Sequence, residues 1–235
     1  MANPVISKVK ELHSYSGETA TYAGVAVKSL SLVGIALASA GVTWVMGYAS
    51  PVTATVTAIM GLITAFAISF RPQWAGFLSP LYAILEGMFL ASISAMFARF
   101  YHGIVLQAVM ITLGIAVSSA LIYAKGYVKV NEGFMRATMM ATMGIAITYF
   151  IEFVLSFFGI RIPMIHQGGI VGILFSLVVI GIATMNLFVD YEQIQQSVRQ
   201  GMPKEYEWFC AFGLLVTLVW LYIEVLNLLR KLKDE

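Results

Sequence analysis

Seven long apolar runs, separated by short polar or turn-forming stretches, constrain this chain more than any other feature. Each run has about the 20 residues that an α-helix needs to cross a bilayer. A helix satisfies its own backbone hydrogen bonds inside lipid, and the alternation typical of a membrane β-barrel is absent. The chain has 235 residues, of which 60% are hydrophobic and 11% charged. We therefore predict an all-α, seven-transmembrane-helix membrane protein, with helices over 29–48, 51–70, 76–98, 103–123, 136–158, 169–190 and 208–229.

The polar segments predict how the chain is divided and oriented. Residues 1–28 are expected to form a polar N-terminal tail, 29–230 the seven-helix domain and 231–235 a C-terminal tail. The tail and the even-numbered loops carry nine Lys and Arg residues, and the opposite side carries five. Because positive loops stay on the cytoplasmic side, we expect a cytoplasmic N-terminus. The net charge of +2 is too small to suggest nucleic acid.

Motifs for enzymatic chemistry are missing. There is no HExxH zinc motif and no glycine loop of the kind that cradles phosphate. No serine inside a span has a histidine on a neighbouring run that could activate it. We expect neither an enzyme nor a bound cofactor. The three histidines lie outside the apolar runs or at their edges, at His13, His102 and His166.

Carboxylates inside the apolar runs are the residues that could carry function. An acidic side chain costs about 3 kcal/mol at the centre of a lipid-facing helix, so these groups should face the interior. Polar neighbours at helical spacing support this, as Tyr82 does for Glu86. A shared interior path would resemble a cation or proton route, and neighbouring carboxylates in low dielectric would bind a proton at neutral pH. The four are Glu86, Glu152, Asp190 and Glu224.

Each carboxylate also has a structural interpretation. Glu86 and Glu152 could be protonated and bonded to a backbone carbonyl or a tyrosine. Asp190 could be an interfacial residue at the start of the polar connector 191–207. Glu224 could pair with Arg230, although six residues is a poor spacing for a helical ion pair.

Three stretches are specific enough to compare with known families. The sixth run closes with Asp-Tyr-x-x-Ile at Asp190, residues 79–94 read SPLYAILEGMFLASIS, and residues 206–224 read YEWFCAFGLLVTLVWLYIE. Together with the seven runs and the arginine after the second run, they resemble the transmembrane Bax inhibitor motif family. The resemblance covers essentially the whole chain and is greatest to the bacterial YccA-like branch.

This resemblance implies a calcium leak that responds to pH. It also implies an acidic pair on the sixth and seventh helices as the proton sensor, with an arginine on the second helix as a latch. Asp190 matches the acid of the sixth helix, and Arg71 is the expected latch, although an arginine at this place is more often a positive-inside anchor. The acid of the seventh helix is Glu224 if LYIEVLNLL is matched to the family motif. A match without a gap from Ala211 gives Thr217 instead.

We therefore expect a passive, pH-sensitive calcium (cation) leak channel. Asp190, Arg71, Thr217 and Glu224 would form the sensor and gate, with Asp190 and Glu224 as oxygen ligands for the metal. Glu86 and Glu152 would line the ion path. The expected partners are the lipid bilayer and calcium or protons. We expect a monomer whose last helix lies near the centre of the bundle.

Two other functions remain open. Through the same resemblance, the chain could be a regulator and substrate of an FtsH-type membrane ATP-dependent protease, which would grip the N-terminal tail. A proton-coupled transporter would need discontinuous helices around a midplane pocket, and Gly87 beside Glu86 is the only hint of one.

Overall fold

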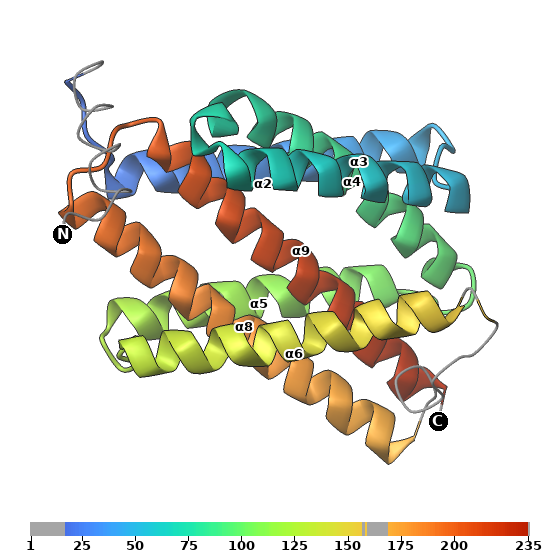
Figure 1. The fold of residues 1–235 in the computed structure, drawn as a ribbon. Coiled ribbons are helices and arrows are strands. Elements are labelled where there is room, and N and C mark those ends of the chain that lie inside the picture. Colours follow the sequence, from blue (N-terminus) through green and yellow to red (C-terminus); the bar gives the residue numbers. More distant parts are fainter. Residues whose placement is uncertain (1–16, 157, 159–168, 235) are drawn as a thin grey trace. The chain divides into compact units, whose positions relative to one another are not determined.

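The computed structural model describes residues 17–156, 158 and 169–234, and nearly all of them lie in long helices (Figure 1). Within this part of the chain, seven helices are long and apolar enough to cross a membrane. The described residues contain no β-strand, only an isolated bridge between Thr19 and Pro203. The predicted all-α, seven-span fold is confirmed. The elements are α2 (Tyr22–Val45), α3 (Pro51–Phe70), the 3-10 turn η1 (Pro72–Trp74), α4 (Ala75–Ala98), α5 (Ile104–Ala124), α6 (Glu132–Ser156), α8 (Ile170–Arg199) and α9 (Tyr206–Lys233).

Helix α2 begins inside the predicted tail, at Tyr22 and not at residue 29. Thr21 is the N-cap, and its hydroxyl accepts a hydrogen bond from the Gly24 N–H at 3.0 Å. Such a cap satisfies one of the backbone donors that the first turn leaves unpaired. Lys28 therefore lies within the helix and not ahead of it. Most of the remaining tail, residues 1–16, lies outside the described residues.

Helix α8 continues past Asp190 into the predicted connector and ends at Arg199. The residues after Asp190 are polar but suit a helix, and the Gln196 amide donates to the Glu192 carboxylate one turn away at 3.0 Å. Gly201, at φ 63, then reverses the chain in the left-handed region that favours glycine. The N–H groups of Gly201 and Met202 bond back to Val198 O and Ser197 O, which is a Schellman ending.

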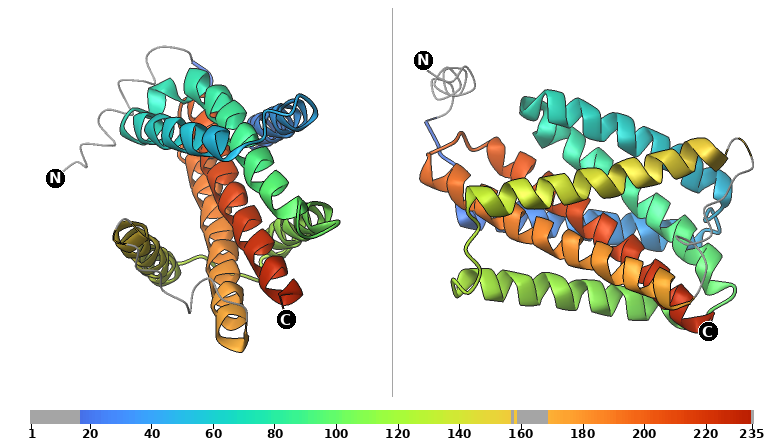
Figure 2. Two further views of the ribbon diagram at one scale, coloured as in Figure 1. Left: turned by 90° about the vertical axis from the view of Figure 1, so that its right-hand side faces the viewer. Right: turned by 60° about the horizontal axis from the view of Figure 1, so that its bottom comes forward.

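The helices fall into two compact units. The first holds the described residues up to Met96 together with Asp190–Val216, and the second holds Phe97–Val189 and the described residues from Thr217 on. Helices α8 and α9 contribute to both units, and Figure 2 shows each of them as an unbroken helix. Asp190 therefore belongs to the first unit, whereas Thr217 and Glu224 belong to the second.

Close contacts between α2 and α4 organise the first unit. A Cβ atom on Gly87 would lie 2.2 Å from Ala36 O, so only glycine allows the two helices to approach this closely. The Ser39 hydroxyl donates to Ile84 O at 2.8 Å beside this contact. Helix α4 is continuous through Gly87, so the hint of a helix break there is wrong.

Polar contacts join α8 to α6 and α9 in the second unit. The Asn186 amide donates to the Thr142 hydroxyl at 2.8 Å, and Lys231 Nζ donates to Gly172 O at 3.0 Å. Lys231 thus lies on a helix that extends to Lys233, inside the segment expected to be a tail. Of the spans described, α9 is the most buried, with 56% of its most apolar window buried. Its central position in the bundle stays a prediction.

Candidate functional site

Asp190 lines a pocket of about 270 Å³ in the first unit. The pocket is formed by the last turns of α8, the α8–α9 turn and the first turns of α9, so its walls come from one continuous stretch of chain. It has room for several water molecules. Carboxylate, amide and hydroxyl oxygens face it, which are the ligands that calcium prefers. The polar lining residues are Asp190, Gln193, Gln196, Ser197, Gln200 and Tyr206.

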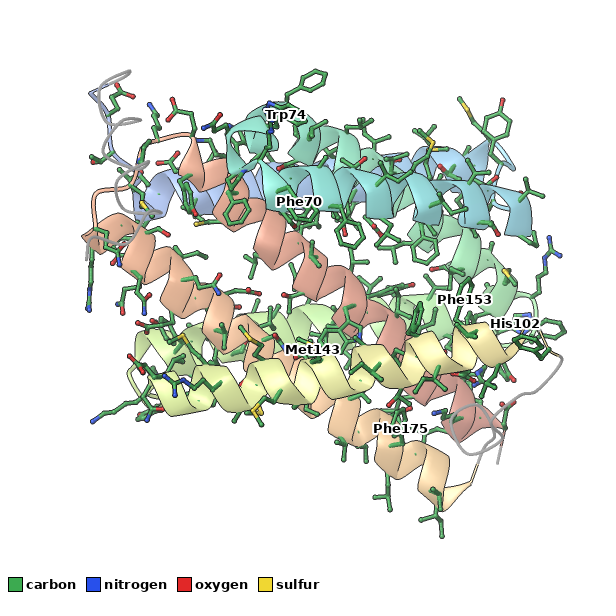
Figure 3. The ribbon with its side chains drawn as sticks, viewed as in Figure 1. Phe70, Trp74, His102, Met143, Phe153 and Phe175 are labelled. Atoms are coloured by element: carbon green, nitrogen blue, oxygen red, sulfur yellow. The ribbon has the colours of Figure 1, made fainter. Side chains whose placement is uncertain are left out.

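Arg71 lies at the turn between α3 and η1, and its side chain is exposed. Its guanidinium carbon lies 5.1 Å from the ring centre of Trp74, which Figure 3 labels near Phe70 at the end of α3. This cation–π contact holds the arginine at the end of the helix. The latch role of Arg71 toward Asp190 stays a prediction, although both residues belong to the first unit.

Glu86 is buried on α4, as predicted from its stripe with Tyr82. Tyr82, one turn earlier on the same helix, interacts electrostatically with this carboxylate. A Cβ atom on Gly61 of α3 would lie 3.0 Å from Glu86 Oε1, so the missing side chain of the glycine makes room for the acid. A tyrosine is one of the two partners, with a backbone carbonyl, that the structural interpretation names for Glu86.

Glu224 is buried on α9 in the second unit. Its Oε1 accepts hydrogen bonds from the Tyr149 hydroxyl of α6 at 2.7 Å and from Trp220 Nε1 at 3.2 Å. Arg230, the partner suggested by the sequence, forms an ion pair with Asp234 at 3.5 Å. Two aromatic side chains of the second unit therefore donate hydrogen bonds to Glu224.

Glu152 and Lys231 add two more buried charges to the second unit. Lys231 is only 2% exposed, and it donates to Gly172 O at 3.0 Å and to the Ser176 hydroxyl at 2.9 Å. Both Glu152 and Glu224 interact electrostatically with its ammonium group. Sequence reasoning counted Lys231 as a loop charge. Its long apolar stem allows it to lie along α8 instead.

Thr217 is buried on α9, and it belongs to the second unit, whereas Asp190 belongs to the first. The choice between Thr217 and Glu224 as the partner of Asp190 therefore stays open. Among the residues described, no group of three His, Cys, Asp or Glu side chains could hold a metal ion. The assignment of Asp190 and Glu224 as calcium ligands stays a prediction. His13 and His166 lie outside the described residues.

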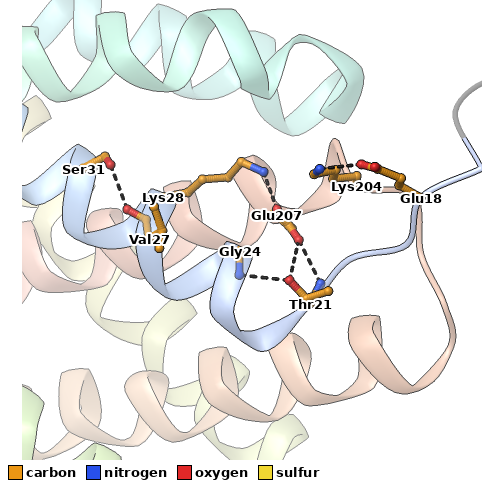
Figure 4. A network of polar contacts seen from close by, with 8 residues as sticks. All are labelled: Glu18, Thr21, Gly24, Val27, Lys28, Ser31, Lys204 and Glu207. Carbon is orange, nitrogen blue, oxygen red and sulfur yellow. Dashed lines mark hydrogen bonds and ion pairs between the residues drawn. The ribbon is translucent and has the colours of Figure 1, made fainter.

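Sequence reasoning missed a buried ion pair between Lys28 and Glu207, drawn in Figure 4. Glu207 is 1% exposed, and its Oε1 also accepts the Thr21 N–H at 2.8 Å and the Thr21 hydroxyl at 3.1 Å. The sequence assigned Glu207 to the polar connector. An acid just inside a helix that follows Pro203 is a usable signal, because anions are stabilised at helix N-termini. Its partners lie far away in sequence, so no local pattern could identify them.

The chain leading into α2 runs antiparallel to the α8–α9 turn. Ala20 N–H donates to Met202 O at 2.7 Å, and Lys204 N–H donates to Glu18 O at 3.2 Å. The side chains of Lys204 and Glu18 also form an exposed ion pair (Figure 4). Their hydrogen bond raises the pKa of Lys204 above its ordinary value. We refer to residues 18–21 as the strap.

The seven apolar spans with buried acids on α4, α6 and α9 define a multi-pass helical membrane protein. A family model described as Bax inhibitor 1 like matches residues 3–234. The chain therefore belongs to the Bax inhibitor 1 like family, and the resemblance at the family level is confirmed. The bacterial YccA-like branch stays a prediction. Searches of curated proteins and of solved structures found no match.

Proposed function

We propose that this protein is a passive, pH-sensitive leak for calcium or a similar cation across the bacterial cytoplasmic membrane, with its N-terminus in the cytoplasm. Membership of the Bax inhibitor 1 like family supports the proposal. The observation that carries it is Asp190, a carboxylate within a spanning helix that lines a pocket together with several amide and hydroxyl side chains. Such a residue is costly in lipid and is usually retained for an ion or proton pathway.

The chemistry of the pocket suits a cation that passes and does not stay. Calcium takes six to eight oxygen ligands in a stable site. The other polar residues that line the pocket supply neutral amide and hydroxyl groups: Gln193, Gln196, Ser197, Gln200 and Tyr206. One negative charge attracts a cation, and weak neutral ligands allow it to leave. Conduction requires this combination.

Protonation of Asp190 is the simplest source of pH dependence. The ionised carboxylate attracts a cation, and the protonated acid does not, so the leak should fall as pH is lowered through the range in which Asp190 titrates. Arg71, as the latch, would act on the same carboxylate. A leak that rises in acid would show that protonation releases the latch and would contradict the attraction model.

The other buried acids are proposed to form the rest of the route. Glu86, Glu152 and Glu224 are all buried within apolar spans. Glu224 accepts a hydrogen bond from the Tyr149 hydroxyl, and Glu86 lies one helical turn from Tyr82 on α4. A neutral donor of this kind stabilises a carboxylate without neutralising it, so the charge stays available to a passing cation.

Purified protein in liposomes that enclose a fluorescent calcium indicator tests the proposal. We expect calcium entry above that of protein-free liposomes, at a rate that changes with pH. Protein that is folded and inserted but gives the same signal as empty liposomes at every pH would refute the leak.

A second candidate function, as a regulator and substrate of an FtsH-type membrane ATP-dependent protease, has one supporting observation. The strap connects the N-terminal residues to the α8–α9 turn through Ala20, Glu18 and Lys204. A protease that pulls on the N-terminus would therefore also pull on this turn. Deleting residues 2–16 should slow turnover in cells and leave calcium flux in liposomes unchanged. Unchanged turnover would remove this candidate.

A further inference from the structure

The Glu207 carboxylate is removed from water but has polar partners on both of its oxygens. Lys28 Nζ contacts Oε2, and Thr21 supplies two hydrogen bonds to Oε1 (Figure 4). Glu207 also lies in the first turn of α9, where the helix dipole stabilises an anion. A buried charge with this many partners holds its neighbours in one arrangement, because separating them leaves the charge uncompensated.

The surroundings of the ion pair are fitted to it. A Cβ atom on Gly24 would lie 2.1 Å from Glu207 Oε1, so the first turn of α2 lies directly against the carboxylate. Lys28 Nζ lies 5.4 Å from the ring centre of Trp208. A Cβ atom on Gly76 of α4 would lie 3.5 Å from Trp208 Cδ1. The pair therefore lies where α2, α4 and α9 of the first unit meet.

The same stretch of chain forms part of the wall of the Asp190 pocket. Tyr206 and Cys210, on either side of Glu207 in α9, both line the pocket. Met202 lines it as well, and its carbonyl accepts the Ala20 N–H of the strap. Any movement of the α8–α9 turn away from α2 would change this wall.

We propose that Lys28 and Glu207 form a clamp that controls access to the Asp190 pocket. With the clamp closed, the strap and the first turn of α2 hold the α8–α9 turn in place, and the pocket wall admits solutes slowly. With the clamp open, the turn moves and the pocket becomes accessible. Lys28 and Glu207 are thus positioning residues for Asp190. Only the predicted consequence for calcium flux rests on the proposed function.

Cys210 provides a built-in probe of the clamp. It is the only cysteine of the chain, it lines the pocket, and it is 9% exposed. The rate at which a water-soluble maleimide labels Cys210 in the folded, liposome-embedded protein therefore measures access to the pocket. Labelling after denaturation gives the total thiol, and Cys210→Ser gives the background.

Lys28→Met should speed this labelling by about tenfold or more, the factor expected when one charge-assisted hydrogen bond is lost. Lys28→Arg keeps the charge and should label slowly, as the wild type does. Lys204→Met removes the ion pair between Lys204 and Glu18, whose side chains are 52% and 64% exposed, respectively. Because this pair is exposed, its loss should change the labelling rate very little. Labelling of folded Lys28→Met at the wild-type rate would overturn the clamp.

The choice of variants separates access to the pocket from other effects on labelling. Glu207 acts electrostatically on the Cys210 thiol, so Glu207→Gln could change the reactivity of the thiol directly. For that reason the clamp is tested with Lys28→Met. Tyr149→Phe lowers stability in the second unit and should not speed labelling; if it does, the rates reflect loosening of the whole fold and the clamp is refuted. If Lys28→Met does not fold, Lys28→Gln replaces it with the same expected rise.

Calcium flux and Cys210 labelling test the leak and the clamp independently. If the wild type shows no calcium flux but Lys28→Met still speeds labelling, the leak is refuted and the clamp is kept. A wild type with flux and no change in labelling keeps the leak and refutes the clamp. If both hold, Lys28→Met should also raise the calcium leak while Asp190 stays in place.

Discussion

Gly24 approaches Glu207 so closely that a Cβ atom at position 24 would lie 2.1 Å from Glu207 Oε1. On the same helix, a Cβ atom on Gly34 would meet no atom within 4 Å. Both glycines belong to α2, but Gly24 lies in its first turn against a buried carboxylate, whereas Gly34 lies in its middle and is exposed.

We therefore expect opposite results from the same substitution at these two positions. Gly24→Ala should destabilise by about 1–3 kcal/mol, because the new methyl group displaces Glu207 from Lys28 and Thr21. Gly34→Ala should be neutral or stabilising by up to about 1 kcal/mol through helix propensity. Thermal denaturation of the purified protein in detergent measures both. Equal Tm values for Gly24→Ala and wild type would show that the carboxylate is not held where the structure places it.

Tyr149→Phe removes the hydroxyl that donates to Glu224 at 2.7 Å. A hydrogen bond to a charged group contributes about 1.5–3 kcal/mol, and the Tyr149 ring stays to fill the space. We expect a Tm lower by several degrees. Tyr127→Phe is the control because Tyr127 is 76% exposed, and it should leave Tm unchanged. A Tm for Tyr149→Phe that matches the control would contradict the Glu224 contact.

Lys231 and Lys233 are two residues apart, but only the first is buried. Lys231→Met should lower Tm, because the carbonyl of Gly172 and the Ser176 hydroxyl lose their donor and the nearby carboxylates lose their cation. Lys233→Met removes an exposed side chain that donates to His102 O and should change Tm very little. If both variants have the Tm of the wild type, Lys231 behaves as a tail residue, as the sequence suggested.

The spans could be predicted from the sequence because their physical cause is local. A run of apolar residues long enough for a bilayer specifies a helix wherever it occurs, and α3 has the predicted limits, 51–70. The ends of the other helices depend on single contacts. Thr21 extends α2 by capping it, and the pair between Glu192 and Gln196 lies in the part of α8 beyond its predicted end. The spacing of apolar residues along the chain cannot reveal either contact.

The site shows the same division. Burial of Glu86 and Glu224 follows from the cost of a charge in lipid, so the sequence was sufficient. The partners of Glu224 and Glu207 come from helices far away in the chain, and spacing cannot identify them. Lys231 and Glu207 were both interpreted as solvated because charges near chain ends and turns usually are. Their burial depends on a tertiary contact in each case.

The central claim is that Asp190 governs a cation leak, and calcium flux into liposomes that contain Asp190→Asn tests it most directly. An ionised carboxylate near a cation contributes several kcal/mol at the effective dielectric of a protein, so the leak should fall by at least about tenfold. Its response to pH should also be lost. Glu192→Gln, on the same helix, controls for the removal of one acid and should keep both. An Asp190→Asn protein that conducts calcium at the wild-type rate with the wild-type pH response would contradict the account.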